Sequence, residues 1–211
     1  MDFNHFFIQP IDKSDAKLFI YQYHYLGNKG FRSEYIYGLF DDIGLKGVCV
    51  FHGVSAPETV VGAFGLQRDE QHGLYELGRL AMHPSLNGGN YTSWFVSRAI
   101  KRLCKDTEVR AIISYADSSV GHIGSIYRAC NALYCGVTKP KNDFYVNGKI
   151  KERGKTKNIN GEWKPRPIKH RYVWIYDTTL KLQWPVISCN YNGITKGTAI
   201  KLSDSADILK Y

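Results

Sequence analysis

The chain has 211 residues, of which 44% are hydrophobic, and a formal net charge of +9. This length is enough to bury one sizeable core, and no run approaches the roughly 20 apolar residues that span a bilayer. The first residues show no basic segment followed by an apolar one, so no signal peptide is expected. The five cysteines never form a CxxC pair, which favours small buried side chains in a reducing cytoplasm over disulfides or a zinc site.

The predicted elements alternate between strand and helix over residues 15–137. A helix is expected over residues 15–24, with Ser14 or Asp15 as its N-cap. Strands are expected over 31–40, 47–51, 60–66 and 75–82, the third closing a hairpin across a loop at 55–59. A turn over 84–90 then leads to a helix over 92–104, a buried strand over 109–115, a helix over 124–131 and a strand over 132–137.

Positive charge is concentrated in residues 138–171, where eleven basic residues face three acidic ones and give a net +8. Asn-Gly hairpin signals predict a β-rich arm, and residues 170–176 form a run suited to rejoining the main sheet. Charge clustered in this way favours nucleic-acid binding, and a solvated lysine-rich surface is the alternative. The expected nucleic-acid contacts are Lys139, Lys141, Lys149, Lys151, Arg153, Lys155, Lys157, Lys164, Arg166, Lys169 and Arg171.

Two charged residues lie in or at the end of predicted core strands. Arg79 interrupts an apolar strand and needs a partner, because an unpaired charge in the interior is costly. Asp117, at the end of the next strand, is the expected partner. Such a pair is either structural or placed at the edge of the sheet to orient a ligand.

Further polar residues surround Asp117 in the sequence. Asp117 is suited to the role of general base, and Tyr127 to that of general acid one helical turn later. His122 either belongs to this polar cluster or is an N-terminal helix residue with no role, and His24 and Tyr25 at the end of the first helix are candidates to cover an acceptor or to serve structure alone. The turn at 84–90 exposes N–H groups ahead of a helix, which suits a phosphate, although such glycines also serve simply to reverse the chain. The histidine spacing predicts no metal site.

The segments ELGRL at 76–80, ISYADSSVGHIGSIYRACN at 113–131, YHYLG at 23–27 and KHRYVW at 169–174 carry a family resemblance. The order of elements resembles the GNAT acyltransferase superfamily, and these segments resemble, more narrowly, the Mom family of bacteriophage DNA-modification proteins. The resemblance implies a GNAT-like mixed α/β fold, with a mostly antiparallel central sheet flanked by helices and a basic β-hairpin arm. It places a catalytic domain at 1–177, including the arm at 138–171, and a C-terminal extension at 178–211 that packs on the same domain.

The resemblance also implies an activity: conversion of adenine in double-stranded DNA to N6-(carbamoylmethyl)adenine, which protects phage DNA from restriction in the host cytoplasm. The implied catalytic residues are Asp117, Tyr127, Arg79, His24, Tyr25 and Ser114. The implied donor is acetyl-CoA or another acyl donor, with glycyl-tRNA as an alternative because the turn at 85–90 departs from the usual GNAT pyrophosphate loop. The expected donor contacts are Leu80, Met82, Asn87, Gly88, Gly89, Asn90 and Asn131.

Two rival functions remain open from the sequence. The first is acyl-CoA-dependent transfer to a small amine or a protein, against which the basic arm argues, or to a tRNA. The second is a non-catalytic nucleic-acid-binding protein on the same fold. The oligomeric state, a homodimer included, is left open.

Overall fold

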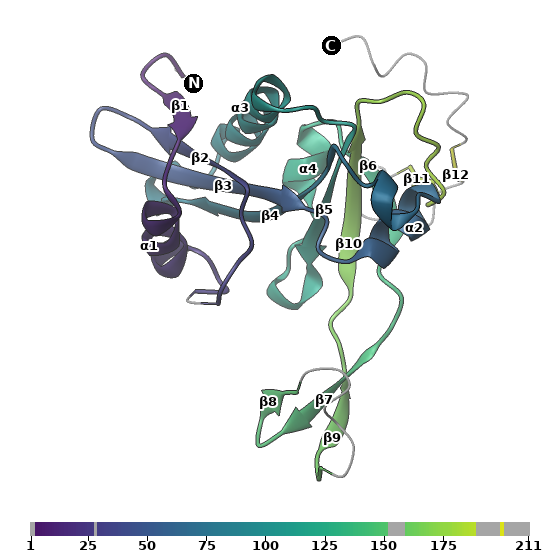
Figure 1. Cartoon of the computed structure of the whole chain (residues 1–211). Coiled ribbons are helices and arrows are strands. Elements are labelled where there is room, and N and C mark those ends of the chain that lie inside the picture. The colour runs from purple at the N-terminus through teal and green to yellow at the C-terminus, as the bar shows by residue number, and fades with distance from the viewer. Residues whose placement is uncertain (1–2, 28, 152–158, 189–198, 201–211) are drawn as a thin grey trace.

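A seven-stranded sheet organises the chain (Figure 1). A computed structural model describes residues 3–27, 29–151, 159–188 and 199–200. The strands follow in the order β1-β2-β3-β4-β5-β10-β6, and every neighbouring pair is antiparallel except β4 and β5. The expected mixed, mostly antiparallel sheet is therefore confirmed. Its strands are β1 Phe7–Pro10, β2 Tyr35–Phe40, β3 Leu45–Gly53, β4 Leu74–Met82, β5 Ala111–Asp117, β10 Lys169–Ile175 and β6 Leu133–Val137.

Helices cover both faces of this sheet. On one face, α1 (Lys13–Tyr23) and α2 (Pro57–Phe64) pack on two separate apolar clusters, and on the other α3 (Tyr91–Asp106) and α4 (Ser125–Ala129) share a third. Strand β3 shows the consequence, because Val48 and Val50 join the cluster under α1 while Cys49 and Phe51 join the one under α3. A strand covered on both sides needs apolar residues at consecutive positions, which explains the continuous apolar run in this segment.

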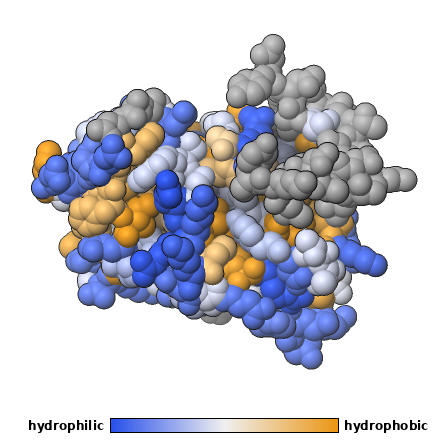
Figure 2. Space-filling view, turned by 90° about the horizontal axis from the view of Figure 1, so that it is seen from above, coloured by the Kyte–Doolittle hydropathy of each residue, from blue (hydrophilic) through white to orange (hydrophobic). Residues whose placement is uncertain are grey.

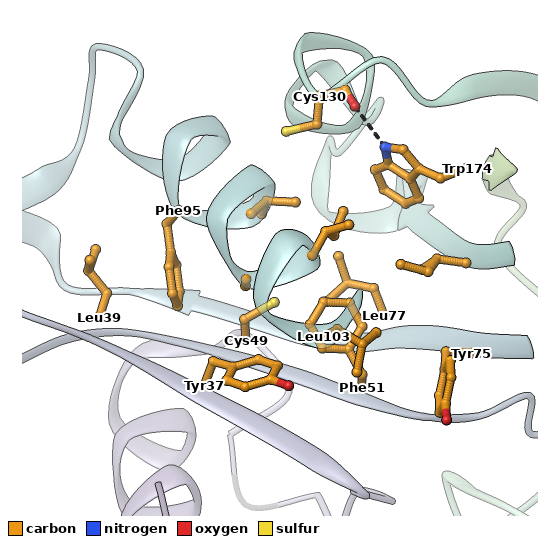
Figure 3. Packing of buried hydrophobic residues seen from close by; sticks show 14 of the residues in the cluster. Tyr37, Leu39, Cys49, Phe51, Tyr75, Leu77, Phe95, Leu103, Cys130 and Trp174 are labelled. Carbon is orange, nitrogen blue, oxygen red and sulfur yellow. Dashed lines mark hydrogen bonds between the residues drawn. The ribbon is translucent and has the colours of Figure 1, made fainter. Parts of the chain in front are cut away.

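The larger core lies between α3 and the sheet (Figure 3). Phe95 and Leu103, on one stripe of α3, pack against Tyr37 and Phe51 from the strands below. The indole N–H of Trp174 in β10 donates to the carbonyl of Cys130, directly after α4, at 2.7 Å. This bond satisfies a buried donor and fixes the end of α4 over the sheet.

The basic arm is a separate three-stranded sheet that projects from the body between β6 and β10 (Figure 1). Its strands are β7 (Asn142–Val146), β8 (Lys149–Ile150) and β9 (Glu162–Pro165), in the order β8-β7-β9. Asn147 and Gly148 between β7 and β8 have φ of 49° and 72°, the left-handed values that a two-residue hairpin turn requires. The Asn-Gly hairpin and the return of the chain through β10 are thus confirmed.

One predicted strand is wrong. Residues 57–64 form helix α2, although the sequence pattern favoured a strand over 60–66. Pro57 occupies the first turn, where its missing N–H costs nothing, and Gly65 ends the helix at φ 71°. Val60, Ala63 and Phe64 are buried at helical spacing, so a continuous apolar run was misread as β.

Smaller corrections concern the ends of the elements and one cysteine. The strand expected from residue 31 begins only at Tyr35, β1 was not foreseen, and α1 has Asp12 as its N-cap. Cys49, Cys130 and Cys135 are buried as expected, whereas Cys104 is exposed on α3 and Cys189 lies outside the described residues.

After β10, residues up to 188 pack against the main body. Leu180 is buried beside α2, and the N–H of Gln183 donates to the carbonyl of Ala63 at 2.7 Å. Two short strands, β11 (Val186–Ile187) and β12 (Ala199–Ile200), pair with each other, and the rest of the expected extension, 189–198 and 201–211, lies outside the described residues. Among the helices that the structure describes, none has both the length and the apolar character to cross a membrane.

Candidate active site at the separation of β4 and β5

The two parallel strands of the sheet separate halfway along their length. Their pairing runs from Leu74↔Ala111 to Leu77↔Ser114, yet β4 continues to Met82 and β5 to Asp117. At the last pair, the buried hydroxyl of Ser114 donates to the carbonyl of Leu77 at 3.1 Å. Beyond it, the facing edges of the strands do not pair with each other, so their backbone groups can bind an extended ligand. Ser114, predicted as catalytic, therefore joins the strands at the start of this separation.

A β-bulge in β4 decides where Arg79 lies. The register with β3 passes from Val50↔Arg79 to Phe51↔Leu77 and leaves Gly78 as the extra residue. A Cβ on Gly78 would lie 2.3 Å from Nε2 of His52, so a larger residue there would require the His52 ring to move. Leu77 joins the core under α3 whereas Ala81 joins the core under α1, and strand alternation places Arg79 on the α1 face with Ala81.

Arg79 does not form the expected ion pair with Asp117. Its Nη1 donates to the carbonyl of Gly78 at 2.7 Å and its Nη2 to that of Gly30 at 3.4 Å, while its buried Nε finds no acceptor in the described structure. Among the described residues, no carboxylate lies within 4.0 Å of the guanidinium. Burial lowers the pKa of Arg79, and Tyr25 and Glu76 act in the opposite direction. A half-buried arginine without a carboxylate is suited to a carbonyl or anionic ligand.

Three aromatic rings gather beside Arg79 on the α1 face. The rings of His24 and Tyr25 stack at 4.5 Å, and the ring of His122 meets Tyr25 edge-on at 5.5 Å. Burial and the charges of Arg79 and His122 lower the pKa of His24 to about 4, so its ring is neutral at physiological pH. Because Nδ1 of His24 accepts from the N–H of Leu26 at 3.1 Å, its proton is carried on Nε2, which makes His24 a donor.

Asp117 lies at the end of β5, close to the same rings. Its Oδ1 accepts from the backbone N–H of Ser119 at 3.0 Å and from the Ser119 hydroxyl at 2.6 Å, and Lys169 lies 4.0 Å from Oδ2. Burial acts to raise the pKa of Asp117, but the bonds from Ser119 and the charges of Lys169 and His122 outweigh it and lower the pKa. Asp117 is therefore ionised at neutral pH and accepts hydrogen bonds. Its charge raises the pKa of Tyr25, in addition to the effect of burial, and so links it to that ring.

Tyr127 belongs to the opposite face of the sheet. Its ring packs against Tyr172 at 5.3 Å and Trp174 at 5.7 Å, in the core shared with α4. Burial raises its pKa to about 12, and Ser114 acts in the opposite direction. Tyr127 therefore keeps its proton at neutral pH. Tyr25 also acts to raise this pKa.

The predicted donor contacts lie along β4 and at the start of α3. Leu80 and Met82 are partly buried under α3, and Gly88 and Gly89 have φ of 90° and 60° in the turn before that helix. The N–H groups of Gly88, Gly89 and Asn90 find no backbone acceptor among the described residues. These groups, together with the free N–H groups of the first turn of α3, are suited to an anion. Asn87 belongs to the same turn, and Asn131 is exposed after α4 with φ of 62°.

The structure divides the predicted nucleic-acid contacts into three groups. Lys139, Lys141, Lys149 and Lys151 are exposed on the arm. Three others have partners within the protein. Arg166 donates to Asp143 at 2.8 Å, and Lys164 forms an ion pair with Glu162 at 2.7 Å. Arg171 donates to the carbonyl of Cys135 at 2.8 Å and lies over the ring of Trp184. Lys169 belongs to the Asp117 site, and Arg153, Lys155 and Lys157 lie outside the described residues.

Sequence reasoning missed His52 and Gly78, and it took Lys169 for a nucleic-acid contact alone. Nothing in the spacing of the first two indicates that a bulge brings them together, because strand register depends on packing across the sheet. In the described part of the chain, no group of three or more His, Cys, Asp or Glu side chains is arranged to hold a metal ion.

The profile of the Mom protein family matches residues 5–191. The chain belongs to the Mom protein family. The match includes every residue of the site, both strands that separate, the arm and the extension as far as β11. No protein with a curated description matches this Mom-family chain.

Solved structures share the fold of this Mom-family chain at low sequence identity. An acetyltransferase from Bacillus subtilis in complex with CoA aligns with a TM-score of 0.51 and 13% identity, over 81% of this chain and 99% of its own. The ribosomal-protein-S5-alanine acetyltransferase from Vibrio fischeri aligns with a TM-score of 0.51 and 13% sequence identity, over 84% of this chain and 97% of its own. A protein from Salmonella typhimurium with its cofactor acetyl-CoA aligns with a TM-score of 0.50 and 12% sequence identity, over 83% of this chain and 96% of its own. The fold is therefore that of GNAT acetyltransferases.

Proposed function

We propose that this chain transfers a glycine-derived group to the exocyclic N6 of adenine in double-stranded DNA and forms N6-(carbamoylmethyl)adenine, which protects phage DNA from restriction. The observation that carries the proposal is the position of Asp117. In a chain of the Mom protein family, this carboxylate lies both at the separation of β4 and β5 and at the root of the basic arm, through Lys169. Asp117 is therefore placed both to accept a proton from an amine and to lie beside the basic surface that would bind a polyanion.

On the acceptor side, the residues of the α1 face fit an adenine. The base must leave the duplex before its N6 can be reached, and the Tyr25 ring, 46% exposed, offers a surface on which it can stack. The N6 amine is a weak nucleophile because its lone pair is delocalised into the ring. Asp117, ionised and held by Ser119, accepts a hydrogen bond from this amine and then its proton, while Arg79 and the Nε2–H of His24 orient the reacting groups.

On the donor side, the free N–H groups at Gly88–Asn90 and the unpaired edge of β4 fit an acyl-CoA. The two similar structures that hold CoA or acetyl-CoA support this choice, and glycyl-tRNA is the alternative donor. When bound, a glycyl thioester or glycyl-tRNA would supply an activated carbonyl carbon. Attack by N6 on that carbon, with release of the thiol or the tRNA hydroxyl, gives N6-glycyladenine; an intramolecular exchange of the two nitrogens between the carbonyl and CH2 carbons then gives the isomeric N6-(carbamoylmethyl)adenine. Tyr127, protonated at neutral pH, lies on this face and supplies a proton to the leaving group through the separation of the strands.

The test is mass spectrometry of nucleosides digested from the DNA of cells that express the chain, beside an Asp117→Asn variant of the same size. A deoxyadenosine species about 57 Da heavier, absent from the variant, supports the proposal. An N6-glycyl and an N6-carbamoylmethyl group add the same atoms, so fragmentation must show which one is present. Unmodified deoxyadenosine with soluble protein would refute the proposal and favour acyl transfer to another amine, with tRNA as the next pool to digest.

A further inference from the structure

A second cationic surface lies away from the site, between α3 and the N-terminal segment. It is an open groove of about 700 Å³, with Trp94 and the cations of α3 on one side and aromatic and aliphatic side chains of residues 3–8 on the other. Figure 2 views the molecule from this side and shows a row of strongly hydrophilic side chains next to hydrophobic ones. In Figure 1, α3 lies above the sheet and the arm below it, so the groove is no continuation of the surface of the arm.

Three cations of the groove have no compensating carboxylate. Arg98, Lys101 and Lys105 are exposed, and among the described residues none of them forms an ion pair. They recur at intervals of three and four residues and therefore share one side of α3 over about 10 Å. Arg102 differs, because its Nε bonds to Asp106 at 2.8 Å. A row of this length exceeds the reach of a single phosphate and is suited to successive phosphates along a strand.

Aromatic rings from both sides of the groove contact one another. Phe3 and Trp94 stack with centroids 4.9 Å apart and an angle of 8°, and Phe3 meets Tyr91 edge-on at 5.5 Å. The guanidinium of Arg98 lies 5.6 Å from the Trp94 ring, so cation and aromatic wall adjoin. Rings beside a row of cations are the combination with which proteins bind single-stranded nucleic acid.

We propose that this groove binds single-stranded DNA, with its phosphates on Arg98, Lys101 and Lys105 and an unpaired base against the Phe3–Trp94 wall. A duplex would present phosphates but no free base face, and it would leave the rings unused. An acidic peptide would likewise use the cations alone. The choice of DNA over RNA rests on the proposed function, whereas the choice of a single strand rests on the groove itself.

Binding can be measured by fluorescence anisotropy with a labelled 12-nucleotide single strand, in the presence of saturating unlabelled duplex that occupies the arm. The test variant replaces Arg98, Lys101 and Lys105 by glutamine. The control replaces Lys17, Arg68 and Lys181, exposed on other elements, by glutamine and so has the same net charge. A second variant, Phe3→Ala, removes a ring and leaves all charges in place, and melting curves establish that each variant is folded.

The groove variant is expected to bind the strand about 100-fold more weakly than the control. Its slope of log affinity against log salt should be smaller by about 2, because each neutralised phosphate of a single strand contributes about 0.7 to that slope. Phe3→Ala is expected to bind the single strand about ten-fold more weakly than the parent chain. Equal affinity of groove variant and control, full displacement of the strand by the duplex, or equally strong competition by an acidic peptide would overturn the proposal. An RNA strand bound more than ten-fold tighter would overturn the assignment to DNA. None of these readouts depends on adenine modification, so failure of the proposed function is seen separately in the nucleoside digest.

Discussion

Replacing Gly124 by alanine tests whether the packing of Tyr172 holds Tyr127 where the site needs it. Gly124 precedes α4 with φ 75°, and an added Cβ would lie 2.2 Å from Cε2 of Tyr172. The Tyr172 ring cannot move away, because it is fully buried, packs against Tyr127 and Tyr134 at 5.3 and 5.2 Å, and donates its hydroxyl proton to the carbonyl of Ile123. The substitution must therefore displace α4 or the ring.

The cost has two parts, and the chain offers a control for one of them. A left-handed alanine costs about 1–2 kcal/mol, and inserting a methyl group into a packed core costs about 1–3 kcal/mol more. Gly121 has nearly the same φ, 74°, but a Cβ there would meet nothing within 4 Å. Gly121→Ala therefore loses only the free energy due to the left-handed backbone. The difference in free energy of unfolding between the two variants measures the overlap with Tyr172.

The assay combines thermal melting with the yield of modified nucleoside. At about 2–4 °C per kcal/mol for a chain of this size, Gly124→Ala is expected to lower Tm by about 10 °C and Gly121→Ala by about 4 °C. Modification measured well below both transitions should fall for Gly124→Ala, because Tyr127 moves with Tyr172, and stay near the parent level for Gly121→Ala. Equal losses of Tm in the two variants, or full activity of Gly124→Ala, would refute this account of the site.

Three further predictions concern charge. Arg79→Lys keeps the charge but loses the planar fork, and it should lower modification about 100-fold while Tm changes by less than about 4 °C; a large loss of Tm would make the residue structural. Because the pKa of His24 is about 4 when folded and near 6.5 when unfolded, protons bind the unfolded chain first, and stability should fall as pH drops from about 6.5 to 4. His24→Gln should flatten the dependence of Tm on pH over that range, and an unchanged profile would contradict the assignment. Replacing the four exposed lysines of the arm by glutamine should lower the salt slope of duplex binding by roughly 3 to 4, whereas an unchanged slope would place the duplex elsewhere; these lysines are Lys139, Lys141, Lys149 and Lys151.

The candidate residues could be singled out from the sequence because their types are unusual for their positions. A guanidinium in an apolar strand and a carboxylate at the end of another stand out in any sequence, and Arg79 and Asp117 do lie at one region of the sheet. The ion pair expected between them is absent, because a bulge at Gly78 and the turn at Ser119 supply each charge with other partners. Helix α2 was missed because a short apolar run fits strand and helix equally well until Pro57 and Gly65 are given weight.

The sequence by itself determined the order of most elements, the hairpin of the arm and the chemical types gathered around Asp117, because apolar periodicity and Asn-Gly turns act over a few residues. Only the tertiary structure decided that β4 and β5 separate after Leu77 and Ser114, that Tyr25 packs between His24 and His122, and that Tyr127 packs against Tyr172 and Trp174. It also decided that residues 3–8 fold against α3 to form a cationic, aromatic groove. Strand register and the contact of distant segments depend on side chains packed across the sheet, and that information is spread over the whole chain.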